Sequence, residues 1–339
     1  MSEMKISVLG AGAWGMALAI HLARNTPANV HVWDRNPVLL EEMSRTRITS
    51  RPRTMPVPET LHFCPNLVDA VHRASYVLSV VPSYATAHLC QQMQNIELPP
   101  EGAVFINCSK GIDPETLRLP WEIFLDAFAG RSDLRYAVLA GPSHAEEVVS
   151  ETPTAVVASA PGTDDAKAIQ NLFYTPRFRV YLQNDYRAVE LGGALKNVMA
   201  IAAGICDGQG YGDNTKAAFI TRALAEMTRL AIACGSDGHS MAGLSGLGDL
   251  IVTTMSRHSR NHRFGELLTQ GYSPQTALAA VGAVVEGYLT TKSVWQLAHR
   301  HNVEMPLAEM IYQVLYENLA IDEAVRKLLN RRPSEEGLA

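Results

Sequence analysis

The stretch from Ile6 to Gly15, ISVLGAGAWG, decides the fold of the first half of this chain. Its first four residues form a short, mostly apolar run that predicts a buried strand, and the residues after Gly15 have the spacing of a helix. Between them stands the pattern G-x-G-x-x-G. In this pattern Gly10 makes a tight turn, Gly12 lets the backbone approach a pyrophosphate, and Gly15 lets helix and strand touch. We therefore predict a dinucleotide-binding unit with phosphate at the helix N-terminus.

The residues that follow the second predicted strand bear on the choice of cofactor. Val30–Trp33 ends directly before Asp34, whose carboxylate is placed to accept hydrogen bonds from the adenosine ribose of NAD. Its neighbour Arg35 is placed to pair with the 2′-phosphate of NADP. The two signals conflict, so we expect both cofactors to bind and do not rank them.

The first half of the chain alternates strand-like and helix-like segments, which indicates a mostly parallel sheet covered on both faces. We expect a Rossmann-like, doubly wound α/β sheet over residues 1–185. The predicted strands are Ile6–Leu9, Val30–Trp33, Tyr76–Val81, Val104–Asn107, Ala137–Leu139 and Ala155–Ala158. The predicted helices are Gly15–Arg24, Pro37–Met43, Tyr84–Met93, Glu115–Phe128 and Asp164–Phe173.

The second half carries almost no strand signal, and we expect an all-α domain over residues 186–332, with a frayed polar tail at 333–339. Gly- and Pro-containing breaks separate its predicted helices. These are expected at about 186–206, 214–234, 261–270, 274–281, 287–301, 306–318 and 321–330. One irregular stretch of the first half, Ser44–Thr60, is rich in Arg and Pro. It is predicted to be a solvated surface loop, and the alternative is a mobile flap that touches a phosphate.

Composition excludes several classes of protein. Apolar residues make up 47% of the 339 residues and charged residues 19%, which is typical of a folded chain of about two domains. The formal net charge of −5 argues against a nucleic-acid-binding surface. The apolar run Val198–Cys206, which contains Gly204, is much shorter than the ~20 residues of a membrane helix, so we expect no stable membrane insertion. Five scattered cysteines without C-x-x-C spacing, and no signal peptide, favour a cytoplasmic protein without a zinc cluster.

A lysine on an unusually thin helix is the first candidate for chemistry. Lys196 follows two adjacent glycines, each of which costs about 1 kcal/mol of helix stability relative to alanine. The residues that share its helix face are small, namely Gly192, Gly193, Ala200 and Ala203. We predict that a ligand lies against this bare face with the Lys196 ammonium aimed at it. The alternative is tight helix packing with the lysine reaching outward to solvent.

Three further clusters are candidates for ligand binding. Lys110 directly follows a predicted strand, at the sheet edge where ligands bind in such folds. Ser143 also follows a strand, where it can cap the short helix through Val149 or donate to a ligand. The run Arg257–Arg263 holds three arginines, Ser and Asn, which suit a small phosphate, although such a run is more often a solvated surface. Asp249, which precedes it, is expected to orient a lysine ammonium or to accept a substrate hydroxyl.

Taken together, these motifs resemble those of bacterial NAD(P)-dependent glycerol-3-phosphate dehydrogenases, in the same order from about residue 5 to 330. The segments around Lys196 and from Asp249 to Asn261 are specific to that family, whereas the glycine pattern is not. The matching stretches are GAGAWG at 10–15, SKG at 109–111, GPSHAEE at 141–147, ELGGALKNVMAIAAGICDG at 190–208, GLSGLGDLIVT at 243–253, SRN at 259–261 and VVEGY at 284–288.

The resemblance implies the reversible reduction of dihydroxyacetone phosphate to sn-glycerol 3-phosphate, feeding glycerophospholipid synthesis, with NAD or NADP as the cofactor and no metal. It implies that Lys196 is the proton donor and acceptor. The implied substrate contacts are Lys110, Gly141, Ser143, Asp249, Ser259, Arg260 and Asn261. The implied cofactor contacts are Trp14, Arg35, Lys110, Ala145, Arg260, Val284 and Glu286, beside Gly10, Gly12, Gly15 and Asp34 from the pattern above. The stretch Ser44–Pro58 departs from the family by lacking its Leu-Pro pattern.

Two alternatives remain open from the sequence. One is a related dehydrogenase of the same architecture that acts on a hydroxy acid, with the arginine run holding a carboxylate. The other is a non-catalytic module that senses NAD(P), which leaves the lysine on a bare helix face without a purpose. The expected partner is a small phosphorylated substrate. The sequence fixes neither the oligomeric state, for which a homodimer stays open, nor any feedback regulation.

Overall fold

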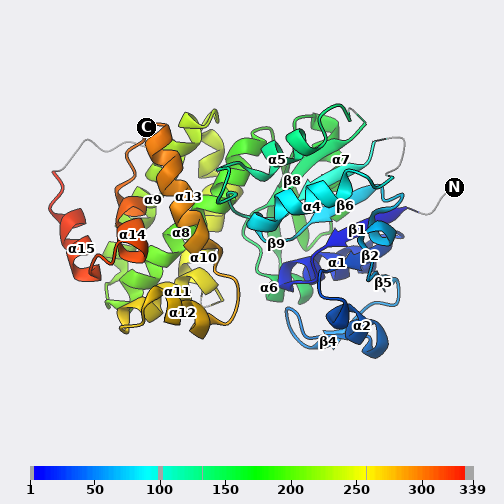
Figure 1. Ribbon diagram of the computed structural model, residues 1–339, viewed down its shortest axis with the longest axis horizontal. Coiled ribbons are helices and arrows are strands. Elements are labelled where there is room, and N and C mark those ends of the chain that lie inside the picture. Colours follow the sequence, from blue (N-terminus) through cyan, green and yellow to red (C-terminus); the bar gives the residue numbers. More distant parts are fainter. Residues whose placement is uncertain (1–3, 98–101, 132, 257, 333–339) are drawn as a thin grey trace. The chain divides into compact units, whose positions relative to one another are not determined.

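The computed structural model describes residues 4–97, 102–131, 133–256 and 258–332 (Figure 1). Arg257 and the tail 333–339 lie outside the described residues, so the expectations for them stay predictions. Contacts divide the chain into two compact units. The first contains residues up to Ser109 together with Pro120–Tyr186, and the second contains Lys110–Leu119 with the residues from Arg187 onward. The predicted domain boundary at residue 185 assigns Lys110–Leu119 to the first part of the chain, whereas this grouping places it in the second unit.

The first unit is built on an eight-stranded sheet in the order β10-β9-β8-β7-β6-β1-β2-β5. Every neighbouring pair is parallel except β8 and β9. The strand order reverses between β1 and β6, which is where such sheets bind dinucleotides. The strands are β1 (Lys5–Leu9), β2 (Asn29–Trp33), β5 (Leu61–Phe63), β6 (Tyr76–Ser79), β7 (Val104–Asn107), β8 (Arg135–Ala140), β9 (Thr154–Ser159) and β10 (Phe178–Gln183).

Helices cover both faces of this sheet, because alternate strand residues are apolar toward each face. Val104 and Ile106 of β7 belong to the core with α1 (Ala13–Asn25), α6 (Ala145–Val149) and α7 (Thr163–Phe173). Phe105, between them, belongs to the core with α3 (Leu67–Val71), α4 (Thr86–Met93) and α5 (Pro120–Ala127). The helix α2 (Pro37–Thr46) packs beside β5. The predicted Rossmann-like sheet is thus confirmed, and Figure 1 shows α1 running beside β1 and β2.

Several predicted boundaries in this unit were wrong. The predicted helix Glu115–Phe128 begins only at Pro120, because Asp113 holds the preceding residues in a turn by accepting the N–H groups of Glu115 and Thr116. The predicted strand Tyr76–Val81 ends at Ser79, and a single 3₁₀ turn, η1 (Ser83–Ala85), precedes α4. The strands β5 and β10 were not predicted. Both flank the sheet as edge strands, where burial is incomplete and the apolar signal is weak.

The Arg-rich stretch Ser44–Thr60 lies at the surface and contains regular secondary structure. It contains the two-residue strands β3 (Ile48–Thr49) and β4 (Met55–Pro56), paired antiparallel. Arg47 holds it by donating to the carbonyl oxygens of Pro58 and Leu61, whereas the side chains of Arg45, Arg51 and Arg53 are exposed.

The described part of the second unit consists of helices, turns and loops and contains no strand, as predicted. The central helix α8 (Tyr186–Gly208) contacts α11 so closely that a Cβ on Gly204 would lie 1.9 Å from the His262 carbonyl oxygen. The remaining helices are α9 (Asp213–Ala233), α10 (Asp249–Met255), α11 (Arg260–Thr269), α12 (Pro274–Val281), α13 (Glu286–Arg300), α14 (Pro306–Tyr316) and α15 (Ile321–Leu329). A 3₁₀ turn, η2 (His239–Ala242), and a π-helical turn, η3 (Leu244–Gly248), precede α10, and neither they nor α10 was predicted.

The helix α8 is long and apolar enough to cross a membrane by length and composition alone. However, 94% of its most apolar window is buried inside the protein, and the core helix of a globular protein passes the same test. The search of the sequence for membrane helices did not identify α8 as long and apolar enough, because it counted only runs of adjacent apolar residues.

Candidate active site

The glycine-rich turn has the geometry that a dinucleotide requires. Gly10 has a φ of +119°, and a Cβ there would lie 2.7 Å from the Val80 carbonyl oxygen. A Cβ on Gly15 would lie 1.9 Å from the Gly10 carbonyl oxygen, so the turn, α1 and the residue after β6 meet at backbone contact. Gly12 differs, because its Cβ would meet nothing within 4 Å. The open space at Gly12 and the N-terminus of α1 at Ala13 fit a pyrophosphate.

Asp34 is tied to this turn. Its Oδ2 accepts the backbone N–H of Ala11 at 2.8 Å, and its Oδ1 accepts that of Asn36 at 2.9 Å. Arg35 is exposed beside it. The indole Nε1 of Trp14 is buried without a hydrogen-bond partner among the described residues, which leaves one donor near the turn unsatisfied. These groups fit a bound NAD or NADP.

The predicted contacts after β8 also lie in the first unit. Gly141 has a φ of +141°, and a Cβ there would lie 3.0 Å from Val156 Cα, so a neighbouring strand requires glycine at this position. The Ser143 hydroxyl donates to the Gly141 carbonyl oxygen at 3.0 Å. Ser143 does not cap α6, because His144 is the N-cap residue and α6 begins at Ala145. The capping alternative for Ser143 was therefore wrong.

The second unit buries the candidate catalytic lysine in a network of charges. Lys196, in the middle of α8, is only 6% exposed. Its Nζ donates to Asp249 Oδ1 and, at 2.8 Å, to Thr253 Oγ1. Lys110 Nζ donates to Asp249 Oδ2 at 2.8 Å. A single carboxylate, itself 1% exposed, thus holds two ammonium groups.

This arrangement sets the protonation of the lysine. Burial lowers the pKa of the Lys196 ammonium to about 7, the Lys110 charge acts in the same direction, and Asp249 opposes both. Burial alone would raise the pKa of the Asp249 carboxyl, but the two ammonium groups outweigh it and hold that pKa below its ordinary value. An amine with a pKa near 7 can both donate and accept a proton at neutral pH, which is the property of a general acid and base.

The small residues before Lys196 make room for protein groups. A Cβ on Gly192 would lie 2.6 Å from the Ser245 carbonyl oxygen, so the π-helical turn η3 rests directly on the α8 backbone there. Gly193 faces the aliphatic chain of Lys110, whose Cγ would be 3.4 Å from an added Cβ. At these two positions protein groups cover the helix face, so the tight packing of the alternative is seen there, whereas its lysine reaching outward is wrong because Lys196 is buried. That a ligand lies against the rest of this face stays a prediction. The glycines bring η3, Asp249 and Lys110 to Lys196, and π-helical turns recur at functional sites.

The N-terminus of α11 carries the predicted phosphate contacts. Ser259 caps this helix by accepting the His262 N–H at 3.2 Å. Arg260 is exposed and forms no ion pair with any residue that the structure describes. Asn261 is 8% exposed, and its carboxamide is bonded to Asn197 and to the Gly287 backbone.

Two of the predicted cofactor contacts of the second unit, Val284 and Glu286, lie at the start of α13, which begins at Glu286. Val284 is 38% exposed, whereas Val285 beside it is buried. Glu286 is partly buried in the first turn of the helix.

Sequence reasoning missed two residues that form hydrogen bonds with the two lysines of the site, Lys196 and Lys110. Thr253 bonds Lys196 directly, and its position one helical turn after Asp249 on α10 is a signal that could have found it. Asn197 donates from Nδ2 to the Lys110 carbonyl oxygen at 3.4 Å and accepts from Asn261. No periodicity marks it, because it follows the lysine directly and points to a different face of α8.

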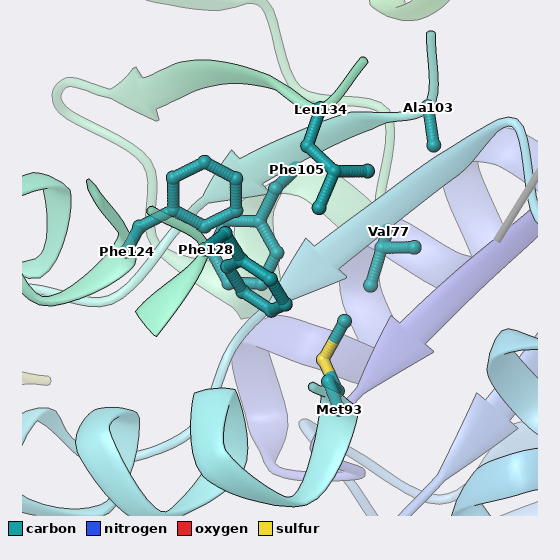
Figure 2. Close-up of a pocket in the computed structure, with 7 residues that line it drawn as sticks. All are labelled: Val77, Met93, Ala103, Phe105, Phe124, Phe128 and Leu134. Carbon is teal, nitrogen blue, oxygen red and sulfur yellow. The ribbon is translucent and has the colours of Figure 1, made fainter. Parts of the chain in front are cut away.

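A small cavity elsewhere in the first unit is not a ligand site. It holds about 10 Å³, roughly the space of one water molecule, and no polar side chain lines it. Figure 2 shows the side chains that line it, namely Val77, Met93, Ala103, Phe105, Phe124, Phe128 and Leu134. Among the described residues, no group of three or more His, Cys, Asp or Glu side chains is placed to hold a metal ion.

A dinucleotide-binding sheet together with a helix-borne lysine of lowered pKa defines a nicotinamide-dependent oxidoreductase. Comparison with known proteins gives the particular family. Residues 5–166 match the model of the NAD-dependent glycerol-3-phosphate dehydrogenase N-terminus, and residues 185–326 match that of its C-terminus. The chain belongs to the NAD-dependent glycerol-3-phosphate dehydrogenase family.

Individual relatives agree over nearly the whole chain. Glycerol-3-phosphate dehydrogenase [NAD(P)+] of Chlorobium limicola is 43% identical over 334 residues, which cover 98% of this chain and 99% of the relative. The protein of the same name from Thermoanaerobacter sp. is 42% identical over 333 residues, with the same coverage. A crystal structure of glycerol-3-phosphate dehydrogenase from Coxiella burnetii is 36% identical, has a TM-score of 0.91 and covers 97% of this chain and 99% of its own. The expected family, the oxidoreductase class and the use of NAD(P) are thus confirmed.

Proposed function

We propose that this chain catalyses the reversible NAD(P)H-dependent reduction of dihydroxyacetone phosphate to sn-glycerol 3-phosphate, with Lys196 as the acid and base. One observation carries the proposal. The Lys196 ammonium is buried between Asp249 and Thr253, and its pKa is lowered to about 7. Supporting it are the names of relatives that are 42–43% identical over nearly the full chain.

The proton chemistry follows from that placement. When bound, the reduced nicotinamide supplies a hydride to the carbonyl carbon of the substrate. Negative charge then develops on the carbonyl oxygen, and the protonated Lys196 stabilises it and delivers a proton from Nζ, which forms the hydroxyl. In the oxidative direction, neutral Lys196 accepts the hydroxyl proton, which a pKa of about 7 permits. Asp249 and Thr253 hold Nζ in place during both directions.

We assign the remaining roles residue by residue. Arg260 binds the substrate phosphate at the N-terminus of α11. Its guanidinium is exposed and forms no ion pair among the described residues. The phosphate contact then positions the carbonyl through binding energy remote from the reacting atoms. The substrate contacts are proposed as Lys110, Gly141, Ser143, Asp249, Ser259, Arg260 and Asn261. The cofactor contacts are proposed as Gly10, Gly12, Trp14, Gly15, Asp34, Arg35, Lys110, Ala145, Arg260, Val284 and Glu286.

The setting of the enzyme is part of the same proposal. The product of this reaction is a precursor for glycerophospholipid synthesis, and we assign the enzyme to the cytoplasm. The five cysteines, all free in the structure, suit a reducing compartment. A homodimer remains the proposed assembly to be tested in solution.

A substrate panel tests the proposed reaction. NADH and NADPH absorbance is followed separately while dihydroxyacetone phosphate, unphosphorylated dihydroxyacetone or a 2-keto acid is added. We expect rapid oxidation with dihydroxyacetone phosphate alone. In the Arg260→Ala variant, KM for the phosphorylated substrate should rise by much more than KM for dihydroxyacetone. Preferential turnover of the keto acid would support the hydroxy-acid alternative, and equal losses for the two ketones would remove Arg260 from the phosphate site.

A further inference from the structure

A chain of hydrogen bonds, together with the covalent side chain of Lys110, connects the N-terminus of α13 to Lys196 within the second unit. Asn261 Oδ1 accepts the Gly287 backbone N–H at 2.9 Å, and Asn261 Nδ2 donates to Asn197 Oδ1 at 3.0 Å. Asn197 Nδ2 in turn donates to the Lys110 carbonyl oxygen at 3.4 Å. The Lys110 ammonium reaches Asp249, which holds Lys196.

The members of this chain are buried and closely spaced. Asn261 is 8% exposed and Asn197 is 6% exposed, so their amide groups are satisfied by protein partners, which for Asn197 Nδ2 also include the Gly193 carbonyl oxygen at 3.3 Å. The Gly287 N–H belongs to the first turn of α13, where backbone donors have no partner within the helix. A Cβ on Gly287 would lie 2.4 Å from the Asn197 carbonyl oxygen and 2.9 Å from Asn261 Oδ1. Only glycine lets the start of α13 reach both asparagines.

We propose that Asn261 is a positioning residue, whose carboxamide joins the start of α13 to Asn197 and thereby holds the Lys110 backbone, so that the Lys110 ammonium is fixed beside Asp249 and Lys196. This proposal rests on the acid–base role of Lys196 proposed above. It gives Asn261 a function that requires no contact with substrate. It also joins the segment that carries Val284 and Glu286 to the lysine pair by hydrogen bonds.

A measurable consequence follows from the charge of Lys110. The charged groups that act on Lys196 are Asp249 of α10 and Lys110, and neither α11 nor α13 adds one to them among the described residues. Lys110 lowers the pKa of Lys196. If Asn261 fixes Lys110, loss of its carboxamide lets the Lys110 charge move away, and Lys196 then titrates at higher pH.

The experiment compares Asn261→Ala, Asn197→Ala and the double variant in the full-length enzyme. We expect each single variant to lose about 10-fold in kcat, because reacting groups are displaced. The pH midpoint of kcat should move upward in both single variants. KM for dihydroxyacetone phosphate should change less than kcat in Asn197→Ala, because Asn197 is not a proposed substrate contact. The double variant should lose little more than either single one, because both break the same chain. Losses that multiply, or a rise in KM with kcat and its pH midpoint unchanged, would overturn the proposal.

Two further variants keep the test decisive. Gly287→Ala should reproduce the upward shift of the midpoint from the other end of the chain. Gly212→Ala at the start of α9, whose Cβ would meet nothing within 4 Å, is its control and should not shift it. If Asn261→Ala does not fold, Asn261→Asp takes its place in the comparison with Asn197→Ala and the double variant. Asn261→Asp retains the acceptor for the Gly287 N–H and removes the donor to Asn197.

The outcome can be separated from that of the proposed function. Titration of the Lys196 and Lys110 side-chain nitrogens by NMR, without substrate, reports their pKa values independently of turnover. If Lys196→Ala keeps its turnover, the acid–base role is wrong, yet the NMR titration still decides whether Asn261 fixes Lys110. An unchanged Lys196 titration in Asn261→Ala would refute the positioning role even if Lys196 proves essential.

Discussion

Lys110 and Lys196 donate to opposite oxygens of one buried carboxylate, that of Asp249. The two lysines come from segments far apart in the chain, and the carboxylate fixes both ammonium groups. Two positive charges and one negative charge are thereby held in a volume with little water, where charges interact strongly. The protonation of Lys196 therefore depends on Lys110 and Asp249, and substitution of either group should be seen in the titration of Lys196.

Removal of the Lys196 amine should abolish most of the turnover. The Lys196→Ala variant loses both the proton donor and the positive charge beside the carbonyl oxygen, so we expect kcat to fall by about 10²–10⁴. Affinity for NADH should change little, because the glycine turn that binds it is formed by other residues. Kinetics and fluorescence titration of NADH measure the two effects. The exposed Lys167→Ala on α7 is the control, and near-normal turnover in Lys196→Ala would contradict the proposed role.

The pH dependence should have opposite signs in the two directions of the reaction. Reduction needs protonated Lys196, so its kcat should fall as the pH rises through about 7, whereas kcat for oxidation should rise. The Lys110→Met variant removes a charge that lowers the pKa of Lys196, so its midpoint should move to higher pH. Asp249→Asn removes the charge that raises this pKa, so its midpoint should move to lower pH. The kcat of each variant, measured as a function of pH, gives these midpoints. Midpoints that shift in the same direction in both variants would show that Lys110 and Asp249 do not act oppositely on Lys196.

The two adjacent glycines of α8 should differ sharply in their tolerance of alanine. A Cβ at Gly192 would lie 2.6 Å from the Ser245 carbonyl oxygen and would push η3, and Asp249 after it, away from Lys196. We expect Gly192→Ala to lose about 10- to 100-fold in kcat and to lower the midpoint of thermal unfolding. Gly193→Ala is the matched control, because its Cβ would only touch the flexible Lys110 chain at 3.4 Å. Equal activity in the two variants would show that η3 does not depend on Gly192.

Much of this fold was predictable from local patterns. The central strands are continuous apolar runs, and the glycine turn after β1 is local in sequence, so both could be identified without coordinates. The edge strand β10 was not predicted because Phe178 and Val180 are its only buried residues, which is a short apolar signal. The turn at Asp113 escaped because a side chain competes there with the helix for backbone N–H groups.

The sequence marks candidate residues for the site but not the hydrogen bonds that connect them. The thin helix face around Lys196 was recognised, yet sequence alone does not tell whether a ligand or a protein segment approaches a missing side chain. The structure shows that Ser245 and Lys110 do so. The bonds from Asn261 to Asn197 and to Gly287 join residues 64 and 26 positions apart, respectively, and no periodic pattern encodes contacts of that kind.

A buried carboxylate away from the site should make stability depend on pH. Glu226 on α9 accepts the backbone N–H groups of Leu307 and Ala308 at the start of α14. Burial raises its pKa to about 7, although these hydrogen bonds act in the opposite direction. A raised pKa means that the folded protein binds the proton more tightly than the unfolded chain. The resulting stabilisation is full below a pH of about 4.5 and is lost as the pH rises through about 7.

Comparison with Glu226→Gln isolates this contribution from those of other groups. The free energy of unfolding of the natural chain, relative to the variant, should fall by about 3 kcal/mol between pH 4.5 and 8. Thermal unfolding across this range in both proteins measures the difference. A pH-independent difference would mean that folding does not raise the pKa of Glu226.

Asp34 should act on NAD and NADP alike, because both of its oxygens bind the backbone around the cofactor site. The Ala11 N–H that it accepts belongs to the glycine turn, so the carboxylate holds the turn in shape for either cofactor. We expect Asp34→Ala to weaken NADH and NADPH binding by a similar factor of about 10, the value of one hydrogen bond to a charged group. Arg35→Ala should weaken NADPH selectively, because only that cofactor carries the 2′-phosphate. Fluorescence titrations measure both affinities, with the exposed Glu41→Ala on α2 as the control. If Asp34→Ala weakens NADH alone and leaves or improves NADPH binding, the carboxylate acts on the ribose hydroxyls and its bond to the turn is secondary.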